Sequence, residues 1–167
     1  MINKIKIDKN VRYLYEIIDD LPHNAFIDKG VTGCGGTTIV LTNDEYYVVA
    51  VHSIGLLKNK CEQHKNVLGV YGDVPSEEIS NYIEFGGKKI IVTYDSLPRL
   101  IKEIDPSKFR LLVDEVQVLI RYAGLFKSKV CNDLINKSFN FKSVSYMTAT
   151  PPPKKYLPEP MRKLPYY

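Results

Sequence analysis

The chain has 167 residues, of which 44% are hydrophobic and 25% are charged. This composition excludes a disordered or fibrous chain and is typical of one globular domain. The net charge of +4 allows a nucleic-acid partner, but it excludes the extreme charge of a dedicated nucleic-acid binder.

The three cysteines are widely spaced and odd in number, which does not resemble a disulfide framework. Cys61 and His64 form a lone C-x-x-H pair, which supplies too few ligands for a zinc site. No apolar run approaches the length of a membrane span, about eighteen residues. We therefore expect a cytoplasmic protein with no membrane partner.

Short apolar runs alternate with segments of helical period along the chain, which is typical of strand-helix-strand units. Val11, Leu14, Tyr15 and Ile18 have helical spacing, which indicates a helix over 11–18, before the first strand. The expected strands cover 25–27, 46–51, 67–71, 89–93, 109–113 and 143–147. The expected helices cover 37–41, 56–64, 76–85, 97–104 and 116–134, with an interruption of the last as an alternative. The pattern predicts an α/β domain over 1–150, with about six mostly parallel strands and helices on both faces.

Proline dominates the chain after Thr150, with a run at 151–153 and further prolines at 158, 160 and 165. Proline is excluded from helix interiors and central strands. We expect 151–167 to form an extended tail or linker.

The first motif is GVTGCGGTT, residues 30–38, between the first strand and the first short helix. It fits the phosphate-binding template G-x-x-x-x-G-K-[ST] except that Gly36 stands at the lysine position. Backbone N–H groups of such a loop converge on phosphate oxygens, and Thr37 stands where the Mg²⁺-binding hydroxyl belongs. A tight glycine turn with a capping threonine is the alternative. The predicted nucleotide-binding residues are Lys29, Gly30, Thr32, Gly33, Cys34, Gly35, Gly36, Thr37 and Thr38.

The second motif is the pair Asp114 and Glu115 at the end of a buried apolar run. Ligand sites of open parallel sheets lie at such strand ends. We predict that Asp114 holds Mg²⁺ and that Glu115 orients or deprotonates an attacking water. An exposed acidic pair that begins a helix is the alternative.

A third strand end carries Thr148, Ala149 and Thr150. With this element the chain resembles the first RecA-like domain of superfamily 2 helicases and translocases, in the DEAD/DEAH-box group. The resemblance covers nearly the whole chain and implies a RecA-like P-loop sandwich of three layers that binds ATP or another NTP with Mg²⁺. In that family the glycine loop is motif I, the acidic pair with Gln117 is motif II, and 148–150 is motif III, which couples nucleotide state to nucleic acid.

Two weaker matches extend the resemblance to segments that touch the nucleic-acid backbone in the family. Motif Ia resembles 49–56 and motif Ib resembles 92–97, although each could be an ordinary strand-to-helix turn. The predicted nucleic-acid residues are His52, Ser53, Lys58, Thr93, Tyr94 and Asp95. Lys58, Lys60, His64 and Lys65 form a basic cluster that could meet phosphates or simply face solvent.

The chain departs from the family at Gly36 and at Gln117, where His or Asp is commoner, and it lacks an adenine-reading glutamine. A phosphate-binding lysine contributes about 1.5–3 kcal/mol, so binding could survive its loss while hydrolysis suffers more. Lys29 would have to fold back over the phosphates to replace it. The family's active site lies between two RecA-like domains, so a second domain in a longer chain or a partner is another source of a cation.

Three functions remain open from the sequence. The favoured one is the nucleotide-binding half of a helicase-like, nucleic-acid-dependent ATPase that is weak or inactive in isolation. The second is a degenerate, non-hydrolysing P-loop domain that binds nucleic acid or a protein. The third is a P-loop hydrolase of another superfamily, against which 148–150 argues.

Overall fold

The computed structural model describes residues 3–5, 7–8, 10–125 and 128–167. In these residues six parallel strands form one sheet in the order β1-β6-β5-β2-β4-β3. The strands are β1 (Ala25–Asp28), β2 (Tyr47–Val51), β3 (Val67–Val70), β4 (Lys89–Thr93), β5 (Arg110–Asp114) and β6 (Ser143–Thr148). The predicted α/β fold with about six parallel strands is confirmed, and each strand lies within one or two residues of its expected position.

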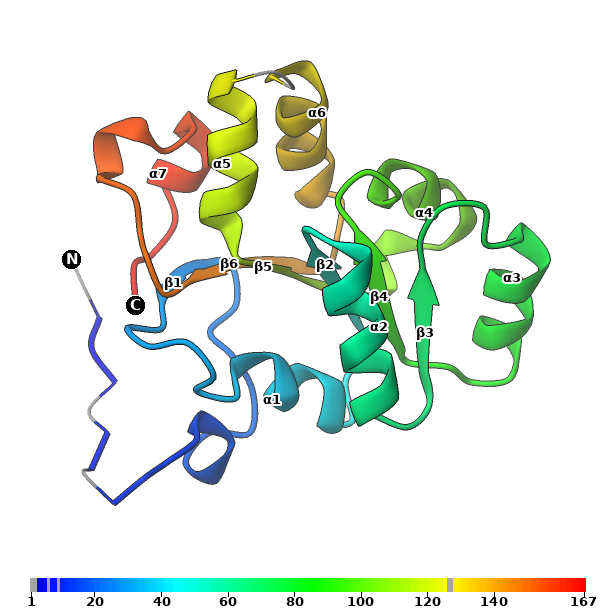
Figure 1. Cartoon of the computed structure of the whole chain (residues 1–167), viewed down its shortest axis with the longest axis horizontal. Helices are drawn as coiled ribbons and strands as arrows, with labels where there is room; N and C mark the ends of the chain where they lie inside the picture. The colour runs from blue at the N-terminus through cyan, green and yellow to red at the C-terminus, as the bar shows by residue number, and fades with distance from the viewer. Residues whose placement is uncertain (1–2, 6, 9, 126–127) are drawn as a thin grey trace.

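Helices cover both faces of the sheet (Figure 1). They are α1 (Gly36–Thr42), α2 (Ile54–Gln63), α3 (Ser76–Glu84), α4 (Leu97–Glu103), α5 (Val116–Leu125), α6 (Ser128–Ser138) and α7 (Glu159–Arg162). The stretch expected as one long helix is therefore divided between α5 and α6. Residues 126–127, which separate α5 from α6 in the sequence, lie outside the described residues.

Alternating side chains of the strands feed two separate hydrophobic clusters. In β2, Val48 and Ala50 belong to the cluster that includes residues of α4, α5 and α6, whereas Val49 and Val51 belong to the cluster that includes residues of α1 and α2. All four are fully buried. Burial of both faces explains why the strands appear in the sequence as continuous apolar runs.

The N-terminal segment differs from the sequence prediction. Instead of a helix through 11–18, it forms a single 3₁₀ turn, Leu14–Glu16. The backbone N–H of Leu14 donates to the carbonyl oxygen of Cys34 at 2.8 Å, so this donor is used by the glycine loop and not by a helical ladder. A helix of two turns is marginal without packing, and here a tertiary contact takes its place.

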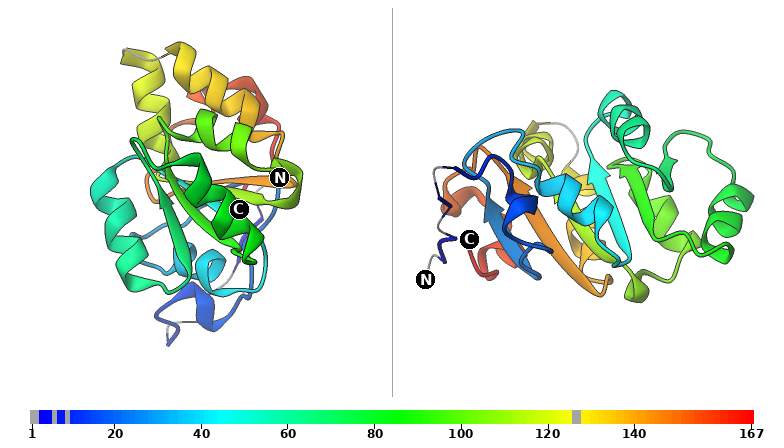
Figure 2. Two further views of the ribbon diagram at one scale, coloured as in Figure 1. Left: turned by 90° about the vertical axis from the view of Figure 1, so that its right-hand side faces the viewer. Right: turned by 90° about the horizontal axis from the view of Figure 1, so that it is seen from below.

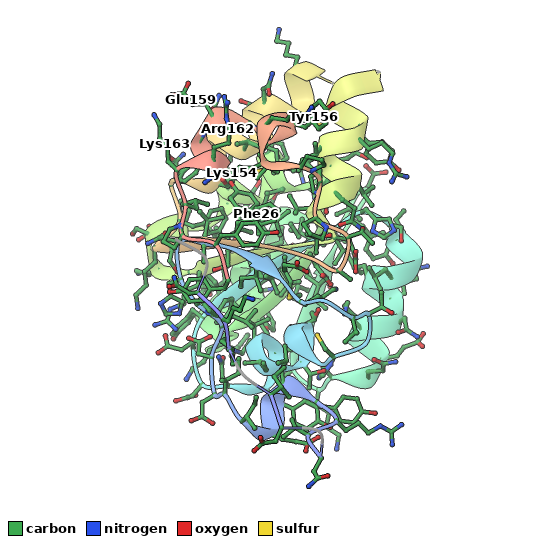
Figure 3. All side chains as sticks on the ribbon, turned by 90° about the vertical axis from the view of Figure 1, so that its left-hand side faces the viewer. Phe26, Lys154, Tyr156, Glu159, Arg162 and Lys163 are labelled. Carbon is green, nitrogen blue, oxygen red and sulfur yellow. The ribbon has the colours of Figure 1, made fainter. Side chains whose placement is uncertain are left out.

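The C-terminal segment returns to the β1 edge of the sheet. Residues 154–156 form a 3₁₀ turn, α7 follows it, and Leu157 and Met161 are buried. The N–H of Phe26 donates to Pro165 O and the N–H of Tyr167 donates to Phe26 O, which extends the sheet beside β1 (Figure 2). Figure 3 shows Lys154, Arg162 and Lys163 on the outside of this segment. Its role as a linker stays a prediction.

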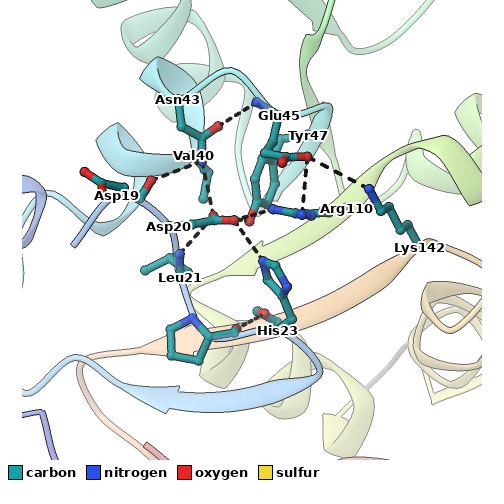
Figure 4. A network of polar contacts seen from close by, with 12 residues as sticks. Asp19, Asp20, Leu21, His23, Val40, Asn43, Glu45, Tyr47, Arg110 and Lys142 are labelled. Atoms are coloured by element: carbon teal, nitrogen blue, oxygen red, sulfur yellow. Dashed lines mark hydrogen bonds and ion pairs between the residues drawn. The ribbon is translucent and has the colours of Figure 1, made fainter.

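A polar network joins the N-terminal segment to the sheet at the end opposite to the glycine loop (Figure 4). The carboxylate of Asp20 accepts hydrogen bonds from Tyr47 Oη, from Asn43 and from the guanidinium of Arg110. His23 lies 2.9 Å from the same carboxylate. The network fixes the chain just before it enters β1.

None of the helices in the described part of the chain combines the length and the apolar character that a membrane span requires.

Candidate functional site

The glycine loop connects β1 to α1 and has a backbone that only glycine adopts without strain. Gly30, Gly33 and Gly35 have φ angles of 67°, 71° and 85°. Any other residue at these positions would have to adopt left-handed backbone angles, which residues with a side chain rarely do. The three glycines are therefore required by the shape of the loop.

The two predicted metal ligands lie side by side. The hydroxyl of Thr37, in the first turn of α1, donates to Asp114 Oδ2 at 2.9 Å. Both residues are buried, with 7% and 4% of their surface exposed. The loop and the end of β5 thus bring together two oxygen groups of the type that Mg²⁺ prefers, although they are 77 residues apart in the sequence.

Lys29, the residue before the loop, points at the acidic pair. Its Nζ lies 3.2 Å from Asp114 Oδ1 and 2.8 Å from Glu115 Oε1. Burial alone would lower the pKa of Lys29, but the two carboxylates outweigh burial, and the net effect is a raised pKa. Lys29 therefore carries its positive charge inside the site.

Glu115 is held in an unusual conformation at the end of β5. Its φ is 54°, which is uncommon for a residue other than glycine and is often found at functional sites. Burial disfavours its charged form, but hydrogen bonds from Lys29 and Gln117 outweigh burial and lower its pKa. The carboxylate is therefore ionised at neutral pH, as a general base must be.

A chain of hydrogen bonds links the acidic pair to the end of β6. Gln117 Nε2 donates to Glu115 Oε2 at 2.5 Å, and the hydroxyl of Thr148 donates to Gln117 Oε1 at 2.6 Å. Thr148 Oγ1 in turn accepts from the N–H of Thr150 at 3.0 Å. Ala149 lies between them, half-buried. The four residues predicted to couple the motifs thus lie together, and their coupling role stays a prediction.

The position of the absent loop lysine is occupied by a methionine side chain. A β-carbon placed on Gly36 would lie 2.7 Å from Met147 Sδ and 3.2 Å from its Cε. Met147 belongs to β6 and is 1% exposed. Any side chain at position 36 would therefore require Met147 to move.

Lys29, the glycine loop and the acidic pair line one cavity of about 510 Å³. Its lining includes the predicted Lys29, Gly33, Cys34, Gly35, Gly36, Thr37, Thr38, Asp114 and Glu115, together with Tyr13, Tyr15, Leu56, Lys60, Gln63 and Met147. Gly30 and Thr32 are exposed loop residues outside this lining. A second cavity, of about 640 Å³, lies at the opposite end of β4, and its lining, which includes Tyr82, Phe85 and Lys89, contains no acidic residue.

Sequence reasoning missed Lys60 as a residue of this site. Its Nζ lies 3.9 Å from Asp114 Oδ2, and its side chain is 16% exposed. The sequence places Lys60 three residues after Leu57 and four after Leu56, which is the spacing of one helix face. Leu57 is buried, so that face is the inward one, and this is the signal that could have found Lys60.

The predicted nucleic-acid residues follow the adjacent strands β2 and β4, and they differ in exposure. His52, Lys58 and Asp95 are exposed, and the ammonium of Lys58 lies 5.4 Å from the ring centre of Tyr71. Ser53 accepts a hydrogen bond from the N–H of Leu56 and begins α2. Thr93 and Tyr94 are buried, and the Tyr94 hydroxyl donates to the backbone oxygen of Asp114. The Tyr94 side chain therefore supports the acidic pair and is not at the surface.

Comparison with solved structures gives the same fold. The chain is similar to a hypothetical ATP-dependent RNA helicase from Sulfolobus tokodaii, with a TM-score of 0.59 and 20% identity over 84% of this chain and 44% of that chain. It is also similar to the Hef helicase domain of Pyrococcus furiosus, with a TM-score of 0.56 and 17% identity over 83% of this chain and 31% of that one. The chain thus spans less than half of either structure. No protein-family model and no curated protein sequence matches it. The predicted RecA-like fold is that of helicase domains.

Proposed function

We propose that this chain is the nucleotide-binding domain of a superfamily 2, helicase-like NTPase that acts with nucleic acid. The observation that carries the proposal is the meeting of Thr37, Asp114, Glu115 and Lys29 at one cavity beside a glycine loop. An exposed glycine turn and a separate acidic pair would have no reason to share buried hydrogen bonds.

The residues present fit a magnesium nucleotide. Among the described residues, no three His, Cys, Asp or Glu side chains are grouped as a resident metal cage requires. A hydroxyl and one carboxylate side by side suit Mg²⁺, which keeps waters and takes its remaining ligands from phosphates. When bound, the nucleotide would supply the phosphoanhydride bond, and Mg²⁺ would neutralise part of the negative charge of the phosphates.

The side chains divide the remaining tasks. Thr37 and Asp114 would hold the metal, and the loop N–H groups would bind phosphate oxygens. Glu115 would orient the attacking water and accept its proton at the carboxylate that Gln117 now holds. Lys29 would exchange its carboxylate partners for phosphate, which moves a cation toward the charge that hydrolysis develops.

A second function rests on Gly36. A lysine at position 36 would require Met147 to move, and a domain that binds without hydrolysis has no need of that lysine. This alternative is a non-hydrolysing module that binds nucleic acid or protein. A second RecA-like domain, in a longer chain or a partner, belongs to the favoured proposal and not to this one.

Binding of a fluorescent ATP analogue to the purified chain, with and without Mg²⁺, tests the proposal. We expect binding that depends on Mg²⁺ and weakens about tenfold or more in Asp114→Asn and Thr37→Ala. Thr42→Ala, at the exposed end of α1, is the matched control and should bind like the wild type. Absence of binding by the wild type would overturn the proposal. Phosphate release on addition of single-stranded RNA or DNA then separates the hydrolysing domain from the binding module.

A further inference from the structure

The cavity contains a second ammonium group, that of Lys60, whose ion pair with Asp114 is a long one. Lys60 Nζ lies 3.9 Å from Asp114 Oδ2, beyond hydrogen-bonding distance. In the part of the chain that the structure describes, no hydrogen bond of this ammonium with another side chain is found. Asp114 accepts hydrogen bonds from other groups instead: from Thr37 at Oδ2, and from Lys29 and the N–H of Glu115 at Oδ1.

The surroundings of Lys60 favour an additional anion. Its side chain is 16% exposed and lies in the same cavity as Lys29 and the glycine loop. An ammonium group at this distance from its carboxylate can donate a charge-assisted hydrogen bond to an anion that enters the cavity.

The glycine loop itself does not supply a positive charge to the cavity from position 36. Met147 occupies the space beside Gly36, so no side chain at that position reaches the cavity without displacing it. The two lysines instead enter the cavity from other elements: Lys29 from the end of β1, and Lys60 from the inward face of α2, on the helix turn after Leu57. The two ammonium groups approach Asp114 at different oxygens, Oδ1 and Oδ2.

We propose that Lys60 of α2 binds the phosphate groups of the nucleotide and thereby replaces, together with Lys29, the lysine that the glycine loop lacks. The inference rests on the proposed function and deepens it, because it assigns the phosphate contact to a helix that follows a different strand. Lys29 donates hydrogen bonds to both carboxylates and must release them first, whereas Lys60, as far as the described residues show, has only its ion pair with Asp114 at 3.9 Å to give up.

The test compares Lys60→Met and Lys60→Arg with Lys102→Met, a matched lysine on the exposed surface of α4. The probes are methylanthraniloyl derivatives of ATP and AMP, and the measurement is equilibrium binding by fluorescence. We expect Lys60→Met to weaken binding of the ATP probe about tenfold to a hundredfold and to leave AMP binding nearly unchanged. Lys60→Arg should retain most of the ATP affinity, and Lys102→Met all of it.

A second measurement uses the wild-type chain, so that it does not depend on how a variant folds. An acyl-phosphate derivative of ATP transfers its acyl group to a lysine amine near the phosphates, with an amide bond formed and the acyl–phosphate bond broken. Peptide mass spectrometry should find Lys60 acylated, and excess ATP should suppress the labelling. Lys102 should not be labelled above background.

The outcomes separate the two proposals. If the wild type binds the ATP probe but Lys60→Met binds it equally well, or loses ATP and AMP affinity alike, the role of Lys60 is overturned and the nucleotide site stands. The role of Lys60 is also overturned if Lys60 is not acylated, or if excess ATP does not suppress its acylation. If the wild type binds no nucleotide, the proposed function falls and the role of Lys60 falls with it.

Discussion

At the scale of single residues, Gly36 and Met147 form one unit. The methionine side chain fills the space that a residue at position 36 would need, so the two positions depend on each other. Gly36→Lys alone should lower the free energy of unfolding, because overpacking a buried site costs about 1–3 kcal/mol, more than a helix gains from losing a glycine.

Combining Gly36→Lys with Met147→Ala should relieve this clash, because the stem of the lysine can occupy part of the space that the methionine leaves. We expect the double variant to be more stable than the sum of the two single effects by about 1 kcal/mol or more. Urea denaturation of all three variants measures the coupling. Additive effects would mean that the two side chains do not compete for one space.

The site residues show what the sequence could and could not reveal. Thr37, Asp114 and Glu115 were predicted from motifs, since a loop and a strand end carry recognisable patterns of residues. The spacing from Leu57 places Lys60 on the inward face of α2, but its proximity to Asp114 depends on how α2 lies against the sheet. The packing of Met147 onto Gly36 likewise joins residues more than a hundred positions apart, which no local pattern records.

At the scale of elements, α2 depends on its N-cap residue, Ser53. Ser53 Oγ accepts a hydrogen bond from the N–H of Leu56 at 3.3 Å and caps the helix that carries Lys60. Ser53→Ala should lower the free energy of unfolding by about 1 kcal/mol, and Ser53→Asn, which keeps a capping oxygen, should restore most of it. Urea denaturation measures both variants. Because Ser53 is also a predicted nucleic-acid residue, equal loss of nucleic-acid binding in both variants, with stability retained, would favour the contact over the cap.

Most strands could be predicted because they are short apolar runs, and β6 because Val144, Tyr146 and Met147 are flanked by small hydroxyl residues, whereas the N-terminal segment could not be predicted. Val11, Leu14, Tyr15 and Ile18 have helical spacing, but the backbone and side chains of this segment contact the glycine loop. The ring of Tyr15 lies beside Gly35, and Tyr13 stacks on Tyr15 with ring centres 5.1 Å apart. A helical pattern predicts one shared buried face, but here Leu14 is buried while Tyr15 is exposed.

The network around Asp20 ties this segment to β2 and β5 and makes stability depend on pH. Burial opposes ionisation of Asp20, but the hydrogen bonds from Tyr47 and His23 outweigh it, so the folded pKa lies below the ordinary value of 3.8. Arg110 also faces the carboxylate, with Glu45 and Lys89 behind it. A lowered pKa means that the stabilisation is complete above pH 3.8 and is lost as the pH falls below it.

The wild type should therefore exceed Asp20→Asn in stability at pH 7, and the difference should shrink as the pH falls through 4 toward 2. Urea midpoints measured across this range provide the check. Asp105→Asn is the matched comparison, because Asp105 is an acid whose pKa is also lowered but whose side chain only bonds Ser107 locally. A difference for Asp20→Asn that stayed constant with pH would contradict an ionised Asp20 as the source.

At the scale of the whole molecule, the C-terminal segment is packed against the sheet, although its composition resembles that of a linker. Prolines at 158 and 160 do not prevent one helical turn, because they occupy its N-cap and second position, where a proline breaks no hydrogen bond. Met161 in that turn is 1% exposed, and Tyr166 stacks on Phe26 with ring centres 5.3 Å apart.

Met161→Ala should therefore lower the free energy of unfolding of the full chain by about 2–5 kcal/mol, the usual range for a buried methionine. Lys155→Ala, six residues earlier and exposed, is the matched control and should change it by less than about 0.5 kcal/mol. Urea denaturation followed by circular dichroism measures both. A flexible linker toward another domain would make the two variants equally stable, because a linker contributes no buried surface to this one. The expected loss in Met161→Ala alone would instead place 151–167 within the same cooperative unit as β1, with which the segment shares backbone hydrogen bonds, and as the glycine loop that follows β1.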